Sequence, residues 1–287
     1  MQGADRGPSL RCGNATADNR AIPSGSLMLI KRKSIEQAES SRRPSRKPKY
    51  APVTLSEQEG VRYLHFGTEW VQGAMRIRKP DWPELEYAQQ MMAWMLFIES
   101  PRAIVQLGLG AATMTKFCYR QFPEATVTAI ELNPSVIAIC NSMFKLPGLD
   151  ERLTVLEMDA LDFVEDPEHH NAFDVFQCDL YDATARGPVL DTPEFYVACA
   201  NCLTDDGIMT VNLFGDHPSF AKNIKAMKFA FGHVLCLPEV HDGNVVALCF
   251  KTRPTLDEDA LTKRAAQIKL QTKLPAASWV KGLFATD

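Results

Sequence analysis

Short apolar runs alternate with helical patterns between residues 103 and 250, and this alternation constrains the fold more than any other feature of the chain. Strands and helices that alternate in this way form right-handed crossovers between parallel strands. The sequence therefore predicts an α/β fold with a mostly parallel sheet covered by helices on both faces. The predicted strands are Ala103–Leu107, Thr126–Glu131, Leu153–Met158, Phe173–Cys178 and Ile208–Phe214, and the predicted helices are Ala112–Gln121, Pro134–Phe144, Ala160–Glu165, Thr192–Leu203 and Pro218–Phe231.

The alternation breaks at the end of this region. Two further strand-like runs, His233–Val240 and Asn244–Lys251, follow one another directly and are joined by His241-Asp242-Gly243. Asp-Gly between alternating apolar residues is a strong hairpin signal. A mostly parallel, seven-stranded sheet that ends in an antiparallel hairpin is typical of the class I methyltransferase-like (Rossmann-like) fold, and not of the all-parallel dinucleotide-binding fold.

The flanking segments complete a division of the chain into four parts. Two short β-like runs, Val61–Phe66 and Trp70–Ile77, predict a hairpin. The apolar spacing from Glu84 to Glu99 predicts a helix, and Asp257–Thr272 predicts another. We therefore expect a disordered basic tail (1–52), a small N-terminal β segment (53–83), a methyltransferase-like catalytic domain (84–254), and a C-terminal helix with a tail (255–287).

Composition and charge narrow the class of protein. None of the apolar runs reaches the about 18 residues that a membrane helix needs, and the N-terminus lacks a signal-peptide segment, so we expect a cytoplasmic protein without a membrane partner. The first 50 residues hold 11 Lys/Arg and 4 Asp/Glu, which leaves the rest of the chain strongly acidic within an overall charge of −4. An acidic body favours cationic ligands over nucleic acid. The eight cysteines, including Cys199-Ala-Asn-Cys202, are expected to be reduced and structural, and no metal site is predicted.

Glycines and acids follow three successive predicted strands. Gly108 and Gly110 follow the first strand and let a ligand approach the backbone at a helix N-terminus. Glu131 ends the second strand, where an acid can accept hydrogen bonds from both hydroxyls of a ribose. Asp159, followed by Ala160, takes the matching position after the third strand and can accept from the amine of an adenine. Together these residues predict a site for an adenosine-containing ligand.

Two more acids, Asp179 and Asp182, follow the fourth predicted strand. An alkylamine has a pKa near about 10, like lysine, and is a poor nucleophile while it is protonated. A carboxylate within hydrogen-bond reach can bind the cation and accept its proton during attack. If the electrophile is a sulfonium, the leaving group is a neutral thioether that needs no acid. The pair therefore predicts a site where an amine is bound and deprotonated.

The loop that carries these acids resembles the signature of the spermidine synthases, or polyamine aminopropyltransferases. In that family the loop is roughly D-S-S-D-P-x-G-P, followed by a Leu and a Phe-Tyr helix start. The resemblance extends over residues 61 to 251 and implies that Asp179 is the catalytic base and Asp182 an amine-binding partner. The matching residues are Asp179, Asp182, Gly187, Pro188, Leu190, Phe195 and Tyr196.

The resemblance also implies the fold, the reaction and further site residues. Family members have a methyltransferase-like fold behind a small N-terminal β domain and form dimers or larger assemblies. They transfer an aminopropyl group from decarboxylated S-adenosylmethionine to putrescine or a related amine. Glu131 looks like the family's ribose acid and Asp159 like its adenine acid. Gln72 looks like the glutamine that closes the β segment over the cofactor, and Tyr87 like the tyrosine of the family's Tyr-His-Glu.

Three departures from the family pattern keep other functions open. The family's G-G-G-D-G-G is G-L-G-A-A-T here, so Ala111 replaces the Asp that holds the amine end of the donor. Ala88 replaces the His of Tyr-His-Glu, and the signature loop is two residues longer and contains Arg186. Without an acid at residue 111, ordinary S-adenosylmethionine could serve as the donor, which would make the protein a methyltransferase. A non-catalytic nucleoside-binding homologue is the third hypothesis.

Overall fold

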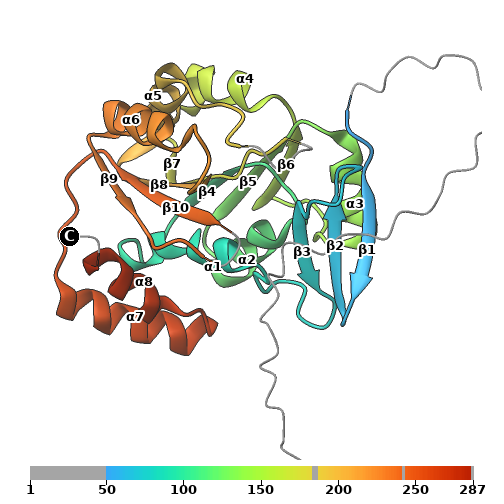
Figure 1. Ribbon diagram of the computed structural model, residues 1–287, viewed down its shortest axis with the longest axis horizontal. Helices are drawn as coiled ribbons and strands as arrows, with labels where there is room; N and C mark the ends of the chain where they lie inside the picture. Colours follow the sequence, from blue (N-terminus) through green and yellow to red (C-terminus); the bar gives the residue numbers. More distant parts are fainter. Residues whose placement is uncertain (1–49, 183–186, 241–242, 286–287) are drawn as a thin grey trace, which may run out of the picture.

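The main body of the protein is one seven-stranded sheet with helices on both sides (Figure 1). The computed structural model describes residues 50–182, 187–240 and 243–285. The strand order across the sheet is β6-β5-β4-β7-β8-β10-β9. The strands are β4 (Ala103–Leu107), β5 (Thr126–Glu131), β6 (Leu153–Glu157), β7 (Phe173–Cys178), β8 (Leu203–Phe214), β9 (His233–Cys236) and β10 (Asn244–Phe250).

The direction of the strands confirms the predicted fold class. Strands β4 to β8 pair in parallel, whereas β10 is antiparallel to both of its neighbours, β8 and β9. Because β10 runs the other way, its first residue lies at the carboxyl edge of the parallel strands. Asn244 is paired there with Phe214, the last residue of β8. Ligands of open α/β sheets bind at this edge.

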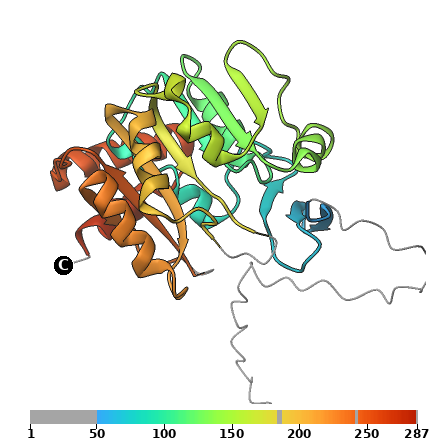
Figure 2. The same ribbon diagram turned by 90° about the horizontal axis from the view of Figure 1, so that it is seen from above.

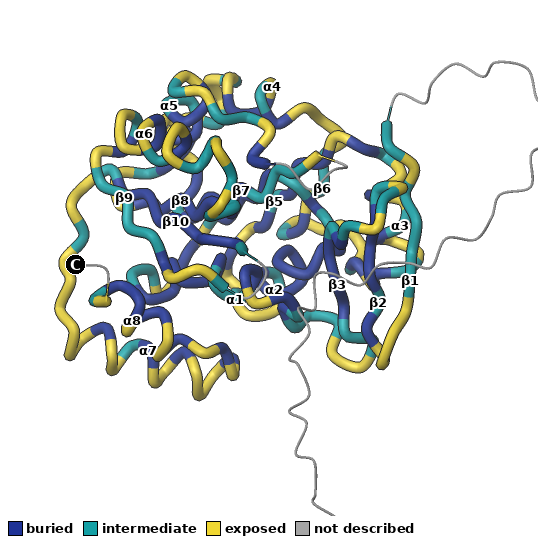
Figure 3. Tube along the Cα trace, in the orientation of Figure 1, coloured by how far each residue is buried: buried dark blue, intermediate teal, exposed yellow. Residues whose placement is uncertain are grey.

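Each buried strand contributes side chains to two separate cores, because successive residues of a strand point to opposite faces. Ile104 and Val175 belong to one core, and their neighbours Val105 and Phe176 belong to the other. The burial colouring of Figure 3 shows the central strands as mostly buried and the outer surface of α7 as largely exposed. The second core is completed by α4 (Ala160–Glu165), α5 (Pro193–Cys202) and α6 (Phe220–Phe231), and the first by α2 (Thr113–Gln121), α3 (Pro134–Met143), α7 (Glu258–Thr272) and α8 (Ala276–Phe284).

The helix boundaries follow local capping signals. Asn133 caps α3, where its side chain accepts a hydrogen bond from the Ser135 N–H at 3.0 Å, and Pro134 occupies the first turn, as predicted. Thr192 caps α5 in the same way, accepting from the Phe195 N–H at 3.2 Å. A short 3-10 helix, η2 (Pro167–His169), follows α4.

A separate three-stranded antiparallel sheet precedes the main body. It consists of β1 (Thr54–Gln58), β2 (Val61–His65) and β3 (Gly73–Arg76), so the predicted hairpin is confirmed and β1 is an addition to it. In Figures 1 and 2 this sheet lies on the side of the molecule away from α7 and α8. The Thr113 hydroxyl donates to the Ala74 carbonyl at 2.7 Å, which ties β3 to the start of α2.

The predicted helix from Glu84 to Glu99 is wrong in its length. The chain forms a short helix α1 (Glu86–Gln90) and then a 3-10 helix η1 (Ala93–Leu96). The break occurs at Met91, whose carbonyl accepts from the side chains of Gln177 and Thr210 at 3.1 and 3.2 Å. These side chains belong to the central sheet, so tertiary hydrogen bonds replace the helical one at this turn.

The C-terminal tail is also more ordered than expected. Residues Ala276–Phe284 form the second C-terminal helix, α8, and Trp279 in it is only 1% exposed. Within the described ranges, none of the helices is long and apolar enough to cross a membrane. Residues 1–49 of the predicted disordered tail lie outside the described residues, as do Arg186 and the His241-Asp242 turn.

Candidate active site

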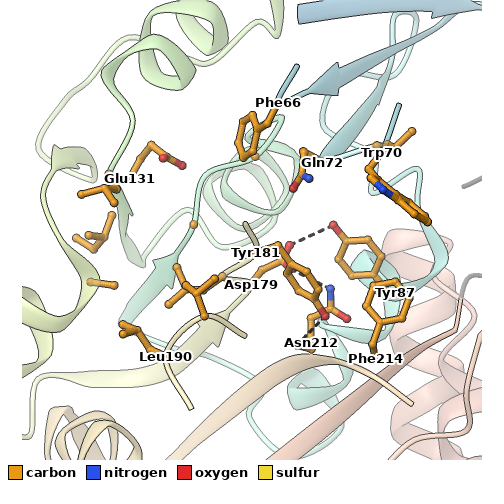
Figure 4. Close-up of a pocket in the computed structure, with 18 of the residues that line it drawn as sticks. Phe66, Trp70, Gln72, Tyr87, Glu131, Asp179, Tyr181, Leu190, Asn212 and Phe214 are labelled. Atoms are coloured by element: carbon orange, nitrogen blue, oxygen red, sulfur yellow. Dashed lines mark hydrogen bonds between the residues drawn. The ribbon is translucent and has the colours of Figure 1, made fainter. Parts of the chain in front are cut away.

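A cavity of about 290 Å³ opens at the carboxyl edge of the main sheet, and Figure 4 shows the side chains around it. Its walls come from the ends of the parallel strands, from the start of β10 and from the segment between β2 and β3. This size is close to the lower end of the range for small-molecule sites. All but one of the predicted site residues line it: Gln72, Tyr87, Gly108, Gly110, Glu131, Asp159, Ala160 and Asp179.

The turn after β4 requires glycine because two strand ends meet there. Gly108 has a φ of 92°, and a Cβ atom at this position would lie 2.3 Å from the Asp179 carbonyl oxygen. Gly110 has a φ of 51°, in the left-handed region that favours glycine. The glycine turn therefore brings the backbone of β4 against that of β7, directly beside the cavity.

Glu131 connects the second strand to this turn. One carboxylate oxygen accepts from the Leu109 N–H at 3.1 Å and the other from the Asn133 N–H at 2.8 Å. Burial raises the pKa of Glu131, and the backbone hydrogen bonds oppose that rise because they favour the charged form. A carboxylate has about four lone-pair sites. Glu131 can therefore fix the glycine turn and still accept hydrogen bonds from a ligand's hydroxyls.

Asp159 lies one strand further along the same edge. Its side chain caps α4 by accepting from the Leu161 N–H at 2.9 Å through Oδ1. Ala160, the first residue of α4, lines the cavity beside it. The capping contact holds the carboxylate at the cavity wall, and the second oxygen can accept from a ligand. The acids of β5 and β6 are thus brought to one end of the cavity, as the sequence predicted.

Asp179 lies at the other end, where two donors hold its carboxylate. Tyr87 donates its hydroxyl to Oδ2 at 3.1 Å, and the Asn212 amide donates to Oδ1 at 2.9 Å (Figure 4). Burial raises the pKa of Asp179, and the hydrogen bonds from Asn212 and Tyr87 act in the opposite direction. Each oxygen keeps a lone pair beyond these contacts. The geometry is that of a fixed acceptor for a proton or a cation.

Asp182 is the predicted site residue that does not line the cavity. Its backbone carbonyl accepts from the Gln72 side chain at 3.1 Å, which connects the segment after β2 to the loop after β7. Gln72 thus lines the cavity from the segment between β2 and β3, and its closing role stays a prediction. Within the described ranges, none of the groupings of His, Cys, Asp and Glu has the three members that could hold a metal ion.

Several lining residues were not singled out as site residues from the sequence. Asn212 and Asn244 come from β8 and β10, and only the position of β10 beside β8 brings Asn244 to the cavity. Their position as polar residues inside apolar strands was the available signal for the two asparagines.

An aromatic wall adds apolar surface that suits an alkyl chain. It consists of Phe66, Trp70, Tyr181 and Phe214.

A smaller side cavity adjoins the first and shares Gln72, Tyr87, Gly110 and Asp179 with it. Ala111 lines it, together with Glu84. The Glu84 carboxylate also pairs with the Arg76 guanidinium, and the Arg76 Nε atom lies 2.9 Å from Oε2. An acid therefore lines the same side cavity as Ala111, the residue that replaces the family's Asp, but it comes from a different part of the chain.

Comparison with known proteins relates the chain to one group of enzymes. The model of the spermine/spermidine synthase domain matches residues 91–258. A polyamine aminopropyltransferase from Neisseria meningitidis is 31% identical over 241 residues, which cover 83% of this chain and 91% of that protein. A probable spermidine synthase from Corynebacterium glutamicum has a TM-score of 0.65 at 20% identity, covering 86% of this chain and 95% of that one. Human methyltransferase-like protein 13, solved in complex with SAH, has a TM-score of 0.58 at 20% identity, covering 66% and 93%. The two solved structures share the fold of this chain.

Proposed function

This chain belongs to the spermine/spermidine synthase family, whose members are transferases, and on that premise we propose that it is an aminopropyltransferase. The donor is decarboxylated S-adenosylmethionine, and the acceptor is a putrescine-like diamine. The observation that carries the proposal is the Asp179 carboxylate, which two neutral donors hold in one cavity with Glu131 and Asp159. One end of the cavity suits a nucleoside and the other a cationic amine.

The reaction uses Asp179 as the base. The ammonium group of the acceptor binds beside the carboxylate and passes one proton to it, which frees the nitrogen lone pair. The nitrogen attacks the methylene carbon next to the sulfonium, a C–N bond forms, and the C–S bond breaks. The electron pair of that bond returns to sulfur and gives methylthioadenosine, a neutral thioether. Because the leaving group is neutral, no general acid is required.

The residues of the nucleoside end hold the donor in this scheme. Glu131 accepts hydrogen bonds from the two ribose hydroxyls, and Asp159 accepts one from the adenine amine. Gly108 and Gly110 line the cavity between these acids and Asp179, where their backbone can face the ligand. Tyr87 and Gln72 lie at the amine end, where the aromatic wall can contact the alkyl chain of the acceptor. Asp182 is proposed to bind the amine from the loop after β7.

The test is the formation of methylthioadenosine. The purified protein is incubated with decarboxylated S-adenosylmethionine and a panel of diamines, and the nucleoside product is followed by chromatography. We expect methylthioadenosine with at least one diamine, and its formation at least about a hundredfold slower with Asp179→Asn under the same conditions. A wild-type protein that binds the donor but releases no methylthioadenosine with any amine would refute the proposal.

A methyltransferase is the second candidate, and Ala111 is the observation that favours it. An acid at residue 111 would repel the carboxylate of ordinary S-adenosylmethionine, and alanine does not. The Arg76–Glu84 pair beside the side cavity presents both charges, so neither donor is excluded by net charge. Calorimetric titration with both donors separates the candidates, because tighter binding of the decarboxylated form supports the aminopropyltransferase.

A further inference from the structure

Two buried asparagines form a hydrogen-bonded relay that ends on Asp179. The Asn244 Nδ2 atom donates to Asn212 Oδ1 at 2.9 Å, and Asn212 Nδ2 donates to Asp179 Oδ1 at 2.9 Å. Asn244 and Asn212 are only 1% and 2% exposed. We propose that Asn244 is a positioning residue that holds the Asn212 amide with its N–H end toward Asp179. This inference rests on the proposed role of Asp179 as the base.

The orientation of Asn212 matters because its two ends have opposite hydrogen-bonding character. The amide has a donor end and an acceptor end of nearly the same shape, so a half-turn about its last bond exchanges them. With the N–H end toward Asp179, the amide stabilises the charged carboxylate. With the oxygen toward Asp179, the amide repels the carboxylate and accepts a hydrogen bond from the protonated acid instead. Asn212 therefore favours the basic form of Asp179 in only one of its two orientations.

Asn244 removes the second orientation. Its Nδ2 group meets the Asn212 oxygen in the observed arrangement, and it would meet an N–H group if Asn212 turned over. Two facing N–H groups in a buried site leave both donors without an acceptor. The Asn244 amide also hydrogen-bonds the Tyr181 hydroxyl, which lowers the pKa of Tyr181. That hydroxyl already donates its proton to the Asn212 carbonyl, so it faces Asn244 as an acceptor and keeps the Asn244 amide from turning over as well. No hydrogen bond joins Asn244 to Asp179 among the described residues, so Asn244 acts on Asp179 through Asn212.

Packing alone does not explain an asparagine at residue 244. The rest of β10 is apolar, and all seven of its residues are buried. The Asn244 Oδ1 atom is buried without a hydrogen-bond partner in the described part of the chain, which costs stability. An apolar residue would avoid this cost. The hydrogen bonds of the Asn244 amide to Asn212 and to the Tyr181 hydroxyl are the contribution that an apolar residue cannot supply.

The other groups that face Asp179 do not fix the orientation of the Asn212 side-chain amide. Tyr87 from α1 donates to the second oxygen, Oδ2, and does not contact the Asn212 amide oxygen. Tyr181 donates to the backbone carbonyl of Asn212 at 3.1 Å, which leaves the side-chain amide free to turn. Burial raises the pKa of Tyr181 and of Cys178 above their ordinary values, so both stay neutral while Asp179 titrates.

The test is a titration of Asp179 in a double-mutant cycle. The Asp179 carboxyl is followed by ¹³C NMR in protein labelled at aspartate, and its signal is assigned by its loss in Asp179→Asn. In Asn244→Leu the protonated acid gains access to the second orientation of Asn212, so we expect the pKa of Asp179 to rise by about one pH unit. Asn212→Leu removes the amide itself and should raise the pKa as well. Adding Asn244→Leu to Asn212→Leu should cause no further rise, because the two residues act in series.

Two further readouts separate this role from a structural one. The acid limb of the kcat/KM profile for the amine should move upward with the pKa in Asn244→Leu, while the Kd for methylthioadenosine stays unchanged. If the leucine variant does not fold, Asn244→Ala serves in its place. An unchanged pKa of Asp179 in a folded Asn244 variant, or an equal rise in the Asn212→Leu background, would overturn the inference. The NMR cycle does not need turnover, so an inactive wild-type protein would refute the proposed function and leave the relay testable.

Discussion

Replacing Glu131 by glutamine tests the nucleoside end of the cavity most directly. Both carboxylate oxygens accept backbone N–H groups, from Leu109 and from Asn133. Glutamine keeps only one of these acceptors and removes the charge that the ribose hydroxyls would contact. A hydrogen bond to a charged group contributes about 1.5–3 kcal/mol. We therefore expect Glu131→Gln to weaken binding by about 3 kcal/mol, or roughly a hundredfold in Kd.

The assay is calorimetric titration with two ligands that differ in the ribose. The Kd for methylthioadenosine should rise by roughly the full hundredfold in Glu131→Gln. Free adenine, which has no ribose, should bind the variant almost as tightly as it binds the wild type. Glu157→Gln is the matched control, because Glu157 pairs with Glu131 across β5 and β6 but is exposed and does not line the cavity. Equal losses for both ligands, or no loss for methylthioadenosine, would refute the ribose role.

The remaining predictions concern the base, the donor and stability. Asp179→Asn should lower kcat by at least about a hundredfold and leave the donor Kd unchanged, as measured by steady-state kinetics and calorimetry. Because burial raises the pKa of Asp179 and the reaction needs its charged form, wild-type kcat/KM should rise with pH through a midpoint above the ordinary value of 3.8. Glu84 lines the side cavity with Ala111, where its carboxylate can bind the amine end of the decarboxylated donor. Glu84→Gln should therefore weaken binding of this donor about tenfold relative to S-adenosylmethionine. Glu86→Gln, at an exposed position, is the control and should leave both affinities unchanged. Trp279→Ala should lower the free energy of unfolding by about 3–5 kcal/mol in denaturant titrations, with the donor Kd unchanged.

The placement of the acids and glycines at one edge of the sheet was predictable because it depends on local sequence. Each parallel strand is a short apolar run, and the residue that follows the run lies at the carboxyl edge whatever the order of the strands. Gly108, Glu131, Asp159 and Asp179 could therefore be placed on one edge before their neighbours in space were known. The structure brings all four to one cavity.

Other features depended on partners that are distant in the sequence. The helix predicted from Glu84 to Glu99 breaks because Gln177 and Thr210 bind the Met91 carbonyl from the central sheet. Asn244 follows a turn signal, and its position beside Asn212 depends on the insertion of β10 between β8 and β9. Helix α8 did leave a local signal, since Trp279, Val280 and Leu283 have helical spacing and are buried.

Local sequence signals and contacts between distant residues correspond to the two ends of the cavity. The nucleoside end is formed by the ends of β4, β5 and β6, which are adjacent in the sheet and follow one another along the chain. The amine end is formed around Asp179 by Tyr87 from α1, Asn212 from β8 and, through Asn212, Asn244 from β10. The glycine turn and Asp179 connect the two ends, because only a residue without a Cβ fits between the backbones of β4 and β7. If the proposed function holds, a change of amine acceptor therefore requires changes on several distant elements, whereas the nucleoside end can stay the same.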